Sequence, residues 1–411
     1  MQVVKKIKVE ELRLGMYLVR FEGAWLASPF WTSKFLIDSP DDLRTAHASG
    51  LRECWIDTSL GCDVAAEAVL SGEAPSAPTV WAPSLKPRAA RQPLTARAVS
   101  FTEELQNASK LCKTARQSIV AMFSHARIGK AVDMAVCASL VNEIVSSVER
   151  HPGALISLSR LKADDDYTYM HSVAVCALMV ALAQSMKLSV DEVHQAGLGG
   201  LLHDIGKARV PAEILNKPGS LSDEEFTTVK RHPQHAYDAL QDGGASEDVR
   251  LICLHHHERM DGRGYPHGQA GEQIPLMARM AAVCDVYDAV TSNRPYKTGW
   301  DPADALAKMI SWKGHFDPAV LAAFIDVVGI YPTGSLVRLK SGRLAVVVEQ
   351  NKSSLTKPRL KVFYSASEQR VIEPEALDLA VDNGDAIGGI EDRAGWPPSV
   401  IETMWAGALA H

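Results

Sequence analysis

The chain has 411 residues, of which 46% are hydrophobic, and a formal net charge of −6 at pH 7. This length allows two or three domains, and the charge does not favour a general nucleic-acid or membrane-surface binder, so we expect neither DNA nor membrane as a partner. The seven cysteines are scattered without a CxxC pair, and no signal peptide or bilayer-length apolar run is present, which predicts a cytoplasmic protein.

The N-terminal region is typical of a small mixed α/β module over residues 1–65. Residues 7–20 and 51–57 have strand patterns, and a short helix is predicted between them, from Asp41 to Ser49. Residues 66–100 are rich in proline and alanine, a composition that predicts an extended linker.

Residues 101–330 have a helical pattern. Apolar residues recur at the helical period from Phe101 onwards, and few strand patterns interrupt them. Helix-start signals repeat along the segment as two capping boxes and two Asp-Pro pairs: Ser189 with Glu192, Ser222 with Glu225, Asp301-Pro302 and Asp317-Pro318. The sequence therefore predicts a central all-α domain.

Residues 331–411 predict a short C-terminal β segment. The run from Leu336 to Leu339 and the run from Leu344 to Val348 favour a hairpin, and Leu360 to Tyr364 favours a third strand. The predicted fold class is thus multidomain: a central all-α helical bundle, a small N-terminal α/β module and a short C-terminal β segment.

Histidines are concentrated in the central domain, where half of the chain's 14 lie between His203 and His267. A packed core does not require this, because each buried imidazole needs a hydrogen-bond partner. Asp285 lies inside an apolar helical stretch, where a carboxylate is costly unless it is paired or metal-bound. The candidate metal ligands are His171, His203, Asp204, His232, His256, His257 and Asp285.

Seven ligands are too many for one tetrahedral zinc ion. They suit two divalent ions of higher coordination number that share a bridging carboxylate and keep open positions for water. Nitrogen and oxygen ligands without thiolate favour Fe or Mn, with Co, Ni or Zn as possibilities in vitro, whereas imidazole is a poor ligand for Mg or Ca.

These residues belong to a series of strings that resembles the HD-GYP family, a branch of the HD-domain phosphohydrolases. The resemblance covers about residues 100–330 in order, and implies that the helical bundle is of the HD type. The N-terminal module resembles the small domain of unassigned function that often precedes this catalytic domain. The strings are His203 to Lys207, Lys217-Pro218, His232-Pro233, His256 to Pro266, Asp285 to Ala289, and Arg294-Pro295-Tyr296-Lys297.

The resemblance implies a metal-dependent phosphodiesterase that opens cyclic di-GMP to pGpG, and often continues to GMP, by attack of a metal-bridging hydroxide. Asp204 would bridge the metals. Lys207 lies one helical turn from His203 and would reach the departing 3′ oxygen or the phosphate; otherwise it is a solvated helix-end cation.

Substrate contacts are implied for Arg294 and Lys297, which would otherwise be an ordinary surface pair. Tyr265 either packs against a base or, with Gly264 and Pro266, only shapes the pocket. Asp165, Glu258 and Asp288 are not expected to bind metal themselves. They are expected to orient the ligand histidines through hydrogen bonds.

One position departs from the family pattern and bears on the number of metals. Some members hold three metals with a glutamate one turn before the first ligand histidine, where this chain has Tyr167. Neutral tyrosine is a poor metal ligand, since its pKa is near 10. We therefore predict a binuclear site.

Several alternatives stay open on sequence alone. The chain could be a cyclic di-GMP receptor with little turnover, or a hydrolase of another nucleotide such as 3′,3′-cyclic GMP-AMP or pGpG. The resemblance also implies docking of a diguanylate cyclase domain on the loop around Tyr265, and a homodimer is possible. The in-cell metal, the end product, the oligomeric state and the role of the N-terminal module are undetermined.

Overall fold

The computed structural model describes residues 4–21, 35–37, 40–47, 52–63, 99–161, 167–217, 219–293, 299–351, 354–382 and 384–410. The chain divides into two compact units. One comprises residues 1–97 with 217–221, and the other comprises residues 98–216 with 222–411.

Over its described residues, the first unit is a four-stranded antiparallel sheet with one α-helix and one 3-10 helix. The strand order is β1-β4-β2-β3. Its elements are β1 (Val4–Lys8), the 3-10 helix η1 (Val9–Glu11), β2 (Tyr17–Phe21), β3 (Phe35–Leu36), α1 (Pro40–His47) and β4 (Glu53–Asp57). Its buried core consists of Ile7, Val9, Leu12, Met16, Leu18, Ile37, Ala46, Cys54 and Ile56.

The strand pattern predicted over residues 7–20 is interrupted in the structure. The carboxylate of Glu11 accepts the backbone N–H of Lys8 at 2.8 Å, which closes the turn of η1. This local bond competes with the ladder of the sheet, so the segment forms two strands instead of one.

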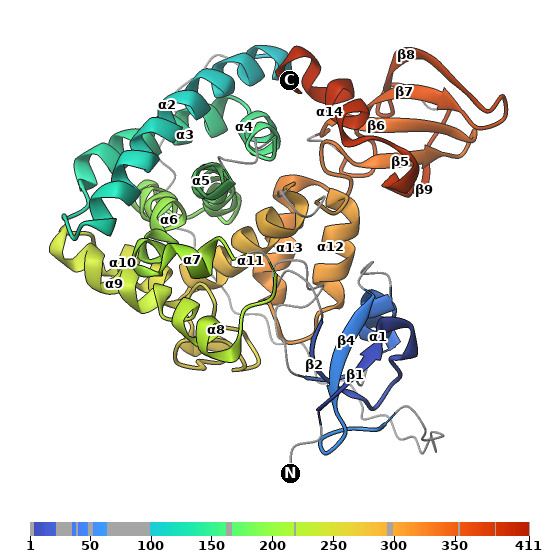
Figure 1. Ribbon diagram of the computed structural model, residues 1–411. Helices are drawn as coiled ribbons and strands as arrows, with labels where there is room; N and C mark the ends of the chain where they lie inside the picture. The colour runs from blue at the N-terminus through green and yellow to red at the C-terminus, as the bar shows by residue number, and fades with distance from the viewer. Residues whose placement is uncertain are drawn as a thin grey trace. The chain divides into compact units, whose positions relative to one another are not determined.

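The second unit begins with a large helical assembly (Figure 1). Its helices are α2 (Phe101–Arg127), α3 (Met134–Arg150), α4 (Pro152–Leu158), α5 (Tyr167–Ser185), α6 (Val190–Leu202), η4 (Ile205–Arg209), α7 (Ala212–Leu215), α8 (Asp223–Val229), α9 (His232–Asp242), α10 (Glu247–His255), η5 (Gly271–Gln273), α11 (Leu276–Thr291), α12 (Pro302–Ser311) and α13 (Pro318–Val328). All four predicted cap residues, Ser189, Ser222, Asp301 and Asp317, accept backbone N–H groups at helix starts.

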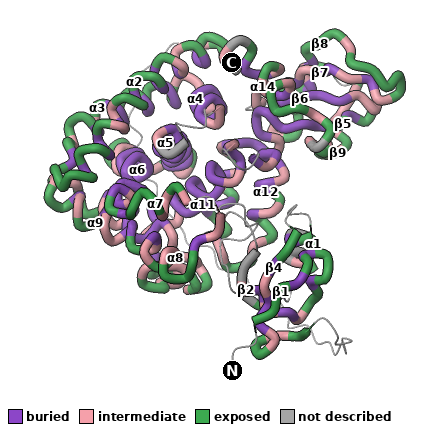
Figure 2. The backbone as a smooth tube through the Cα atoms, viewed as in Figure 1, coloured by how far each residue is buried: buried purple, intermediate pink, exposed green. Residues whose placement is uncertain are grey.

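Helix α5 lies at the centre of this assembly, against α2, α3, α4, α6, α11 and α13. Residues 170–183 are buried on every side of the helix (Figure 2). A helix that is apolar all round is stable only when other elements cover its whole circumference. Within the part of the chain that is described, no helix has both the length and the hydropathy needed to cross a bilayer.

The C-terminal part of the second unit is an antiparallel sheet with strand order β8-β7-β6-β5-β9. It consists of β5 (Leu336–Leu339), β6 (Arg343–Glu349), β7 (Arg359–Ser365), β8 (Arg370–Asp378) and β9 (Ile387–Ile390), followed by η6 (Arg393–Gly395), α14 (Pro398–Ala406) and η7 (Gly407–Ala410). The sheet is joined to the helices by Asp301, which accepts the backbone N–H of Leu336 at 3.0 Å, and by a 3.1 Å hydrogen bond between His151 and Glu349.

This segment is larger than the hairpin and third strand that the sequence predicted. The edge strand β8 contains proline and glutamates and is mostly exposed, and β9 contains two glycines. Such compositions have low strand propensity, so these strands form through pairing with β7 and β5.

Candidate metal centre

The ends of several helices bring the seven predicted ligands together. His203 caps α6, Asp204 precedes η4, His232 opens α9 and His256 caps α10. His171 lies on α5, His257 follows His256, and Asp285 lies on α11.

The seven side chains form two adjoining groups of possible metal ligands. One group consists of His171, His203 and Asp285, and the other consists of Asp204, His232, His256 and His257. Within each group, one donor atom from each residue lies within 4.8 Å of the others. These groups, taken together, are called the seven-donor cluster below.

Asp204 spans the two groups. Its Oδ1 lies 3.3 Å from Nε2 of His232 and 4.0 Å from Nε2 of His256. Its Oδ2 lies 3.4 Å from Nε2 of His203 and 3.7 Å from Nε2 of His171. Oδ1 is buried and has no hydrogen-bond partner among the described residues. A buried carboxylate oxygen without a donor is costly unless a cation completes its surroundings, so this arrangement fits a carboxylate shared by two ions.

Asp285 also contacts both groups. Its Oδ1 lies 3.0 Å from Nε2 of His171, and its Oδ2 lies 3.8 Å from Nδ1 of His257. The surrounding segment of α11, from Met280 to Ala289, is buried throughout, and the carboxylates of Asp285 and Asp288 are the parts of it that contact the histidines. The sequence predicted that Asp285 would be paired or metal-bound, and in the structure its carboxylate contacts the imidazole of His171.

In four of the histidines, Nδ1 of the imidazole is hydrogen-bonded to an acceptor outside the cluster of ligand atoms. Nδ1 of His203, His232 and His256 each donates to a backbone oxygen at 2.8 Å, on Gly200, Val229 and Cys253. Nδ1 of His171 donates to Oδ2 of Asp288 at 2.6 Å. Since a backbone oxygen can only accept, Nδ1 carries a proton in those three rings, and Nε2 is the atom that faces the cluster.

The charge states suit divalent cations. Burial and the neighbouring histidines hold the pKa values of His256 and His257 well below the usual value, and burial also lowers the pKa of His232. Burial opposes ionisation of Asp204, but Lys207 and His203 keep its pKa well below the usual range. For Asp285, a hydrogen bond from His171 outweighs burial and lowers the pKa. The lowered pKa values favour neutral imidazoles at His232, His256 and His257, beside two anionic carboxylates.

His203 differs from the other histidines of the cluster. Burial lowers its pKa, but the carboxylates of Asp204 and Asp285 outweigh that effect and raise it. The His203 imidazole thus holds a proton more strongly than those of His232, His256 and His257, and a cation bound there would compete with that proton.

The turn that carries Asp204 is packed tightly on α9. A Cβ atom at Gly206 would lie 2.0 Å from the backbone oxygen of His232, so only glycine allows this approach. The following residue, Lys207, donates from Nζ to Oδ2 of Asp204 at 2.5 Å, and its side chain is 29% exposed. The amine thus lies at the edge of the cluster and not within it.

Comparison with known proteins identifies the family. A family model described as an HD domain matches residues 141–320, and a domain of unknown function (DUF3391) matches residues 4–137. The chain is 51% identical over 408 residues to a cyclic di-GMP phosphodiesterase, PA4108, of Pseudomonas aeruginosa, covering 98% of this chain and 96% of the relative. The chain belongs to the HD-GYP family.

Two other known proteins match a smaller part of this chain or have a lower sequence identity to it. The HD-GYP chain is 43% identical over 148 residues to the cyclic di-GMP phosphodiesterase response regulator RpfG of Xanthomonas campestris, covering 35% of this chain and 39% of the relative. Among solved structures, an HD-GYP-type protein of Bdellovibrio bacteriovorus, Bd1817, is similar with a TM-score of 0.41 and 16% identity, covering 79% of this chain and 99% of the other.

The loop that gives the HD-GYP family its name lies against the cluster. A Cβ atom at Gly264 would lie 2.5 Å from the backbone nitrogen of Arg259, so the loop folds closely on the end of the His-His segment. The ring of Tyr265 lies 4.7 Å from that of His257, and Pro266 follows through a cis peptide bond. Lys230, which the sequence analysis did not single out, has its Nζ 5.4 Å from the centre of the Tyr265 ring.

Glu258 is placed differently from the expectation that it would orient a ligand histidine. Its Oε1 accepts the backbone N–H of His267 at 2.8 Å, and its Oε2 accepts that of Gln269 at 3.1 Å. The reason is local: the loop returns to its own start, and a buried carboxylate satisfies the N–H groups there. Asp165, Arg294, Lys297 and the side chain of Tyr167 lie outside the described residues of this HD-GYP protein.

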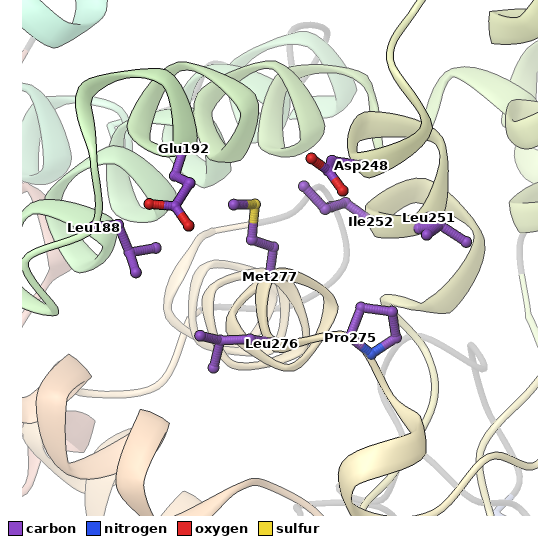
Figure 3. Close-up of a pocket in the computed structure, with 8 residues that line it drawn as sticks. All are labelled: Leu188, Glu192, Asp248, Leu251, Ile252, Pro275, Leu276 and Met277. Atoms are coloured by element: carbon purple, nitrogen blue, oxygen red, sulfur yellow. The ribbon is translucent and has the colours of Figure 1, made fainter. Parts of the chain in front are cut away.

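A separate surface hollow lies among α6, α10 and α11 (Figure 3). Met277 extends from α11 into it, with the carboxylates of Glu192 and Asp248 on either side. The hollow is lined by none of the seven predicted ligands. It is therefore not the site at which the HD-GYP sequence pattern converges.

Proposed function

We propose that this protein is a cytoplasmic, metal-dependent phosphodiesterase that hydrolyses cyclic di-GMP to pGpG and then to GMP. The observation that carries the proposal is the position of Asp204, with one oxygen toward each of two histidine groups. The relative that matches nearly the whole chain is named as an enzyme of this activity.

Two divalent ions, Fe or Mn, are the proposed cofactors of the seven-donor cluster. When bound, such ions lower the pKa of water and neutralise charge on the phosphate. The residues proposed to hold one ion are His171, His203 and Asp285, those proposed to hold the other are His232, His256 and His257, and Asp204 is shared. The donor set supports Fe or Mn because it contains imidazole and carboxylate but no thiolate.

Lys207 is the proposed proton donor. Its Nζ is bound to Oδ2 of Asp204 and its side chain is partly exposed, so it can contact both the cluster and a molecule that enters from solvent. In the proposed reaction Nζ donates a proton to the 3′ oxygen as the phosphodiester bond breaks. This lysine lowers the pKa of Asp204 and so also keeps that carboxylate ionised.

Substrate binding is proposed for the loop beside His257 and for two cations further along the chain. The position of the Tyr265 ring, tilted against that of His257 at 4.7 Å, supports a contact with a guanine base, with Gly264 and Pro266 shaping the pocket wall. Arg294 and Lys297 are proposed to bind the phosphates, and this part rests on the sequence pattern.

Asp288, Glu258 and Asp165 are the proposed orienting residues. Asp288 has the best support, since it accepts the hydrogen bond from Nδ1 of His171. For Glu258 the supported role is to fix the loop after Pro266, because its oxygens bind backbone N–H groups there.

The wider organisation is proposed as follows. Residues 1–65 form a regulatory module, 66–100 a linker, 101–330 the hydrolase domain, and 331–411 a bracing β segment with its tail. A homodimer and docking of a diguanylate cyclase domain on the loop around Tyr265 complete the proposal.

The test is turnover by protein purified without oxygen and loaded with Fe²⁺ or Mn²⁺. Incubation with cyclic di-GMP should yield pGpG and then GMP, and the metal-free protein should yield neither. Tight binding without product would favour a receptor instead. Faster hydrolysis of 3′,3′-cyclic GMP-AMP or of pGpG in competition would reassign the substrate.

A further inference from the structure

A second cluster of metal-ligating side chains lies outside the seven-donor cluster. It consists of His255, Glu258 and His267, and one donor atom from each lies within 4.8 Å of the others. We propose that these three residues bind a single divalent cation of the Zn²⁺ type. This site is independent of the proposed function and is called the loop site below.

The residues of the loop site bracket the loop that contains Tyr265. His255 is the last residue of α10, Glu258 follows three residues later, and His267 comes directly after Pro266. Nδ1 of His255 lies 3.7 Å from Oε1 of Glu258, and the rings of His255 and His267 are 5.5 Å apart. A shared ligand would therefore join the end of the helix to the far end of the loop.

His255 supplies an independent indication that a ligand is missing from its contacts. Its side chain is 5% exposed, and its Nδ1 is buried with no hydrogen-bond partner among the residues that the structure describes. The 3.7 Å distance to Glu258 is too long for a hydrogen bond. An unpaired imidazole nitrogen in a buried position is costly, and a cation between it and the carboxylate would remove that cost.

Glu258 has the capacity and the charge to bind such a cation. It is 2% exposed, and each of its oxygens accepts one backbone N–H, which leaves a further lone pair on each oxygen. Across the described part of the chain, the only basic side chain with a nitrogen within 4.0 Å of its oxygens is His255. The two backbone bonds also hold the carboxylate in one orientation, so the site is preorganised.

Two imidazoles and one carboxylate form a ligand set that Zn²⁺ accepts, with water in the remaining position. Bonds of about 2.0–2.2 Å in tetrahedral geometry put neighbouring donors roughly 3.4 Å apart. The His255 and Glu258 donors are already at 3.7 Å, and His267 is exposed and free to close the remaining difference. Mg²⁺ and Ca²⁺ are excluded as preferred ions because they favour oxygen ligands.

The experiment compares the full-length wild-type protein with His267→Ala and with a matched control, His125→Ala, which removes an exposed histidine on α2. Each protein is stripped, loaded with Zn²⁺, passed through a desalting column and analysed for metal. We expect His267→Ala to retain one equivalent fewer than the wild type and than His125→Ala. Equal zinc contents in all three would overturn the proposal. Since both histidines are exposed, neither variant is expected to disturb the fold.

A second measurement separates the loop site from the seven-donor cluster. In Asp204→Asn, which impairs the cluster, one equivalent of Co²⁺ should still give visible absorption bands of a nitrogen-ligated ion. In Asp204→Asn with His267→Ala those bands should disappear. Persistence of the bands in the double variant, or their absence from Asp204→Asn alone, would contradict the assignment. If His255 instead forms an ion pair with Glu258 and no metal binds, the bands should be absent from Asp204→Asn alone.

Discussion

At the scale of single residues, the account depends on the two oxygens of Asp204. The buried Oδ1 has no hydrogen-bond partner in the described structure, whereas Oδ2 is bound by Lys207. The two oxygens are thus in different surroundings although they belong to one carboxylate. The two cations proposed above, sharing this carboxylate, would account for its contacts with both histidine groups.

Asp204→Asn tests this residue with almost no change of shape. The amide keeps the volume but lacks the charge and the second anionic oxygen, so it cannot be shared by two cations. Metal content should fall, and kcat should fall by about 100-fold or more. Elemental analysis and turnover measure these effects, with Glu213→Gln, an exposed carboxylate on α7, as the control. Full metal content and normal turnover in Asp204→Asn would remove Asp204 from the site.

Lys207→Met separates chemistry from metal binding. Without Nζ the departing oxygen lacks its proton donor, so kcat should fall by about 10²- to 10⁴-fold while the metal content stays near that of the wild type. Lys113→Met on the exposed face of α2 is the control. Loss of metal together with activity would mean that Lys207 acts only by keeping Asp204 ionised.

At the scale of helices and strands, the helix starts could be predicted because they depend on local chemistry. Ser189, Ser222, Asp301 and Asp317 cap helices as expected, since a cap needs only a side-chain oxygen at the right place. Strands β8 and β9 could not be predicted, because their pairing partners lie elsewhere in the chain. The position of Lys230 near Tyr265 could not be predicted either, because the two residues are far apart in the sequence. The sequence near Lys230 shows only that it lies two residues before His232.

The Gly206 contact is an example of tertiary information that the sequence pattern did not provide. Gly206→Ala would place a Cβ 2.0 Å from the backbone oxygen of His232, and η4 and α9 would have to separate. We expect a loss of roughly 1–3 kcal/mol in stability, with lower metal content. Gly395→Ala, where a Cβ meets nothing within 4 Å, should change neither. Unchanged thermal stability and metal content in Gly206→Ala would show that the two elements tolerate a wider spacing.

Helices α2 and α3 are joined by an ion pair whose pH dependence can be measured. Glu104 is fully buried and accepts hydrogen bonds from Arg150 at 2.7 and 2.8 Å and from Ser147 at 2.7 Å. Burial would raise the pKa of Glu104, but these hydrogen bonds outweigh it and lower the pKa. Its stabilising effect is therefore complete above the unfolded pKa and is lost as the pH falls through the lower, folded value.

Glu104→Gln should lower stability at pH 7 by roughly 1–3 kcal/mol, because a charged hydrogen-bond acceptor is lost. The difference from wild type should begin to shrink as the pH falls below about 4, where the carboxylate of the unfolded wild-type chain takes up a proton, and it should vanish only below the lower, folded pKa. Thermal unfolding from pH 3.5 to 7 measures it. A difference that is constant over this range would contradict the lowered pKa.

At the scale of the whole molecule, the second unit combines the helical bundle with a sheet that contains none of the seven predicted ligands. The sheet is attached through Asp301 and Glu349, at the N-terminus of α12 and on β6. The sequence indicated the family correctly, because its histidine and aspartate strings follow one another in the family's order. It did not indicate the size of the sheet, because low-propensity strands form only with their partners.

The central claim is that seven side chains hold two cations that share Asp204. The most direct measurement is anomalous diffraction at the manganese edge from crystals of the Mn²⁺-loaded protein. We predict two anomalous peaks, one on each side of the Asp204 carboxylate, with His171, His203 and Asp285 at one and His232, His256 and His257 at the other. One peak, or peaks that Asp204 does not join, would contradict the account.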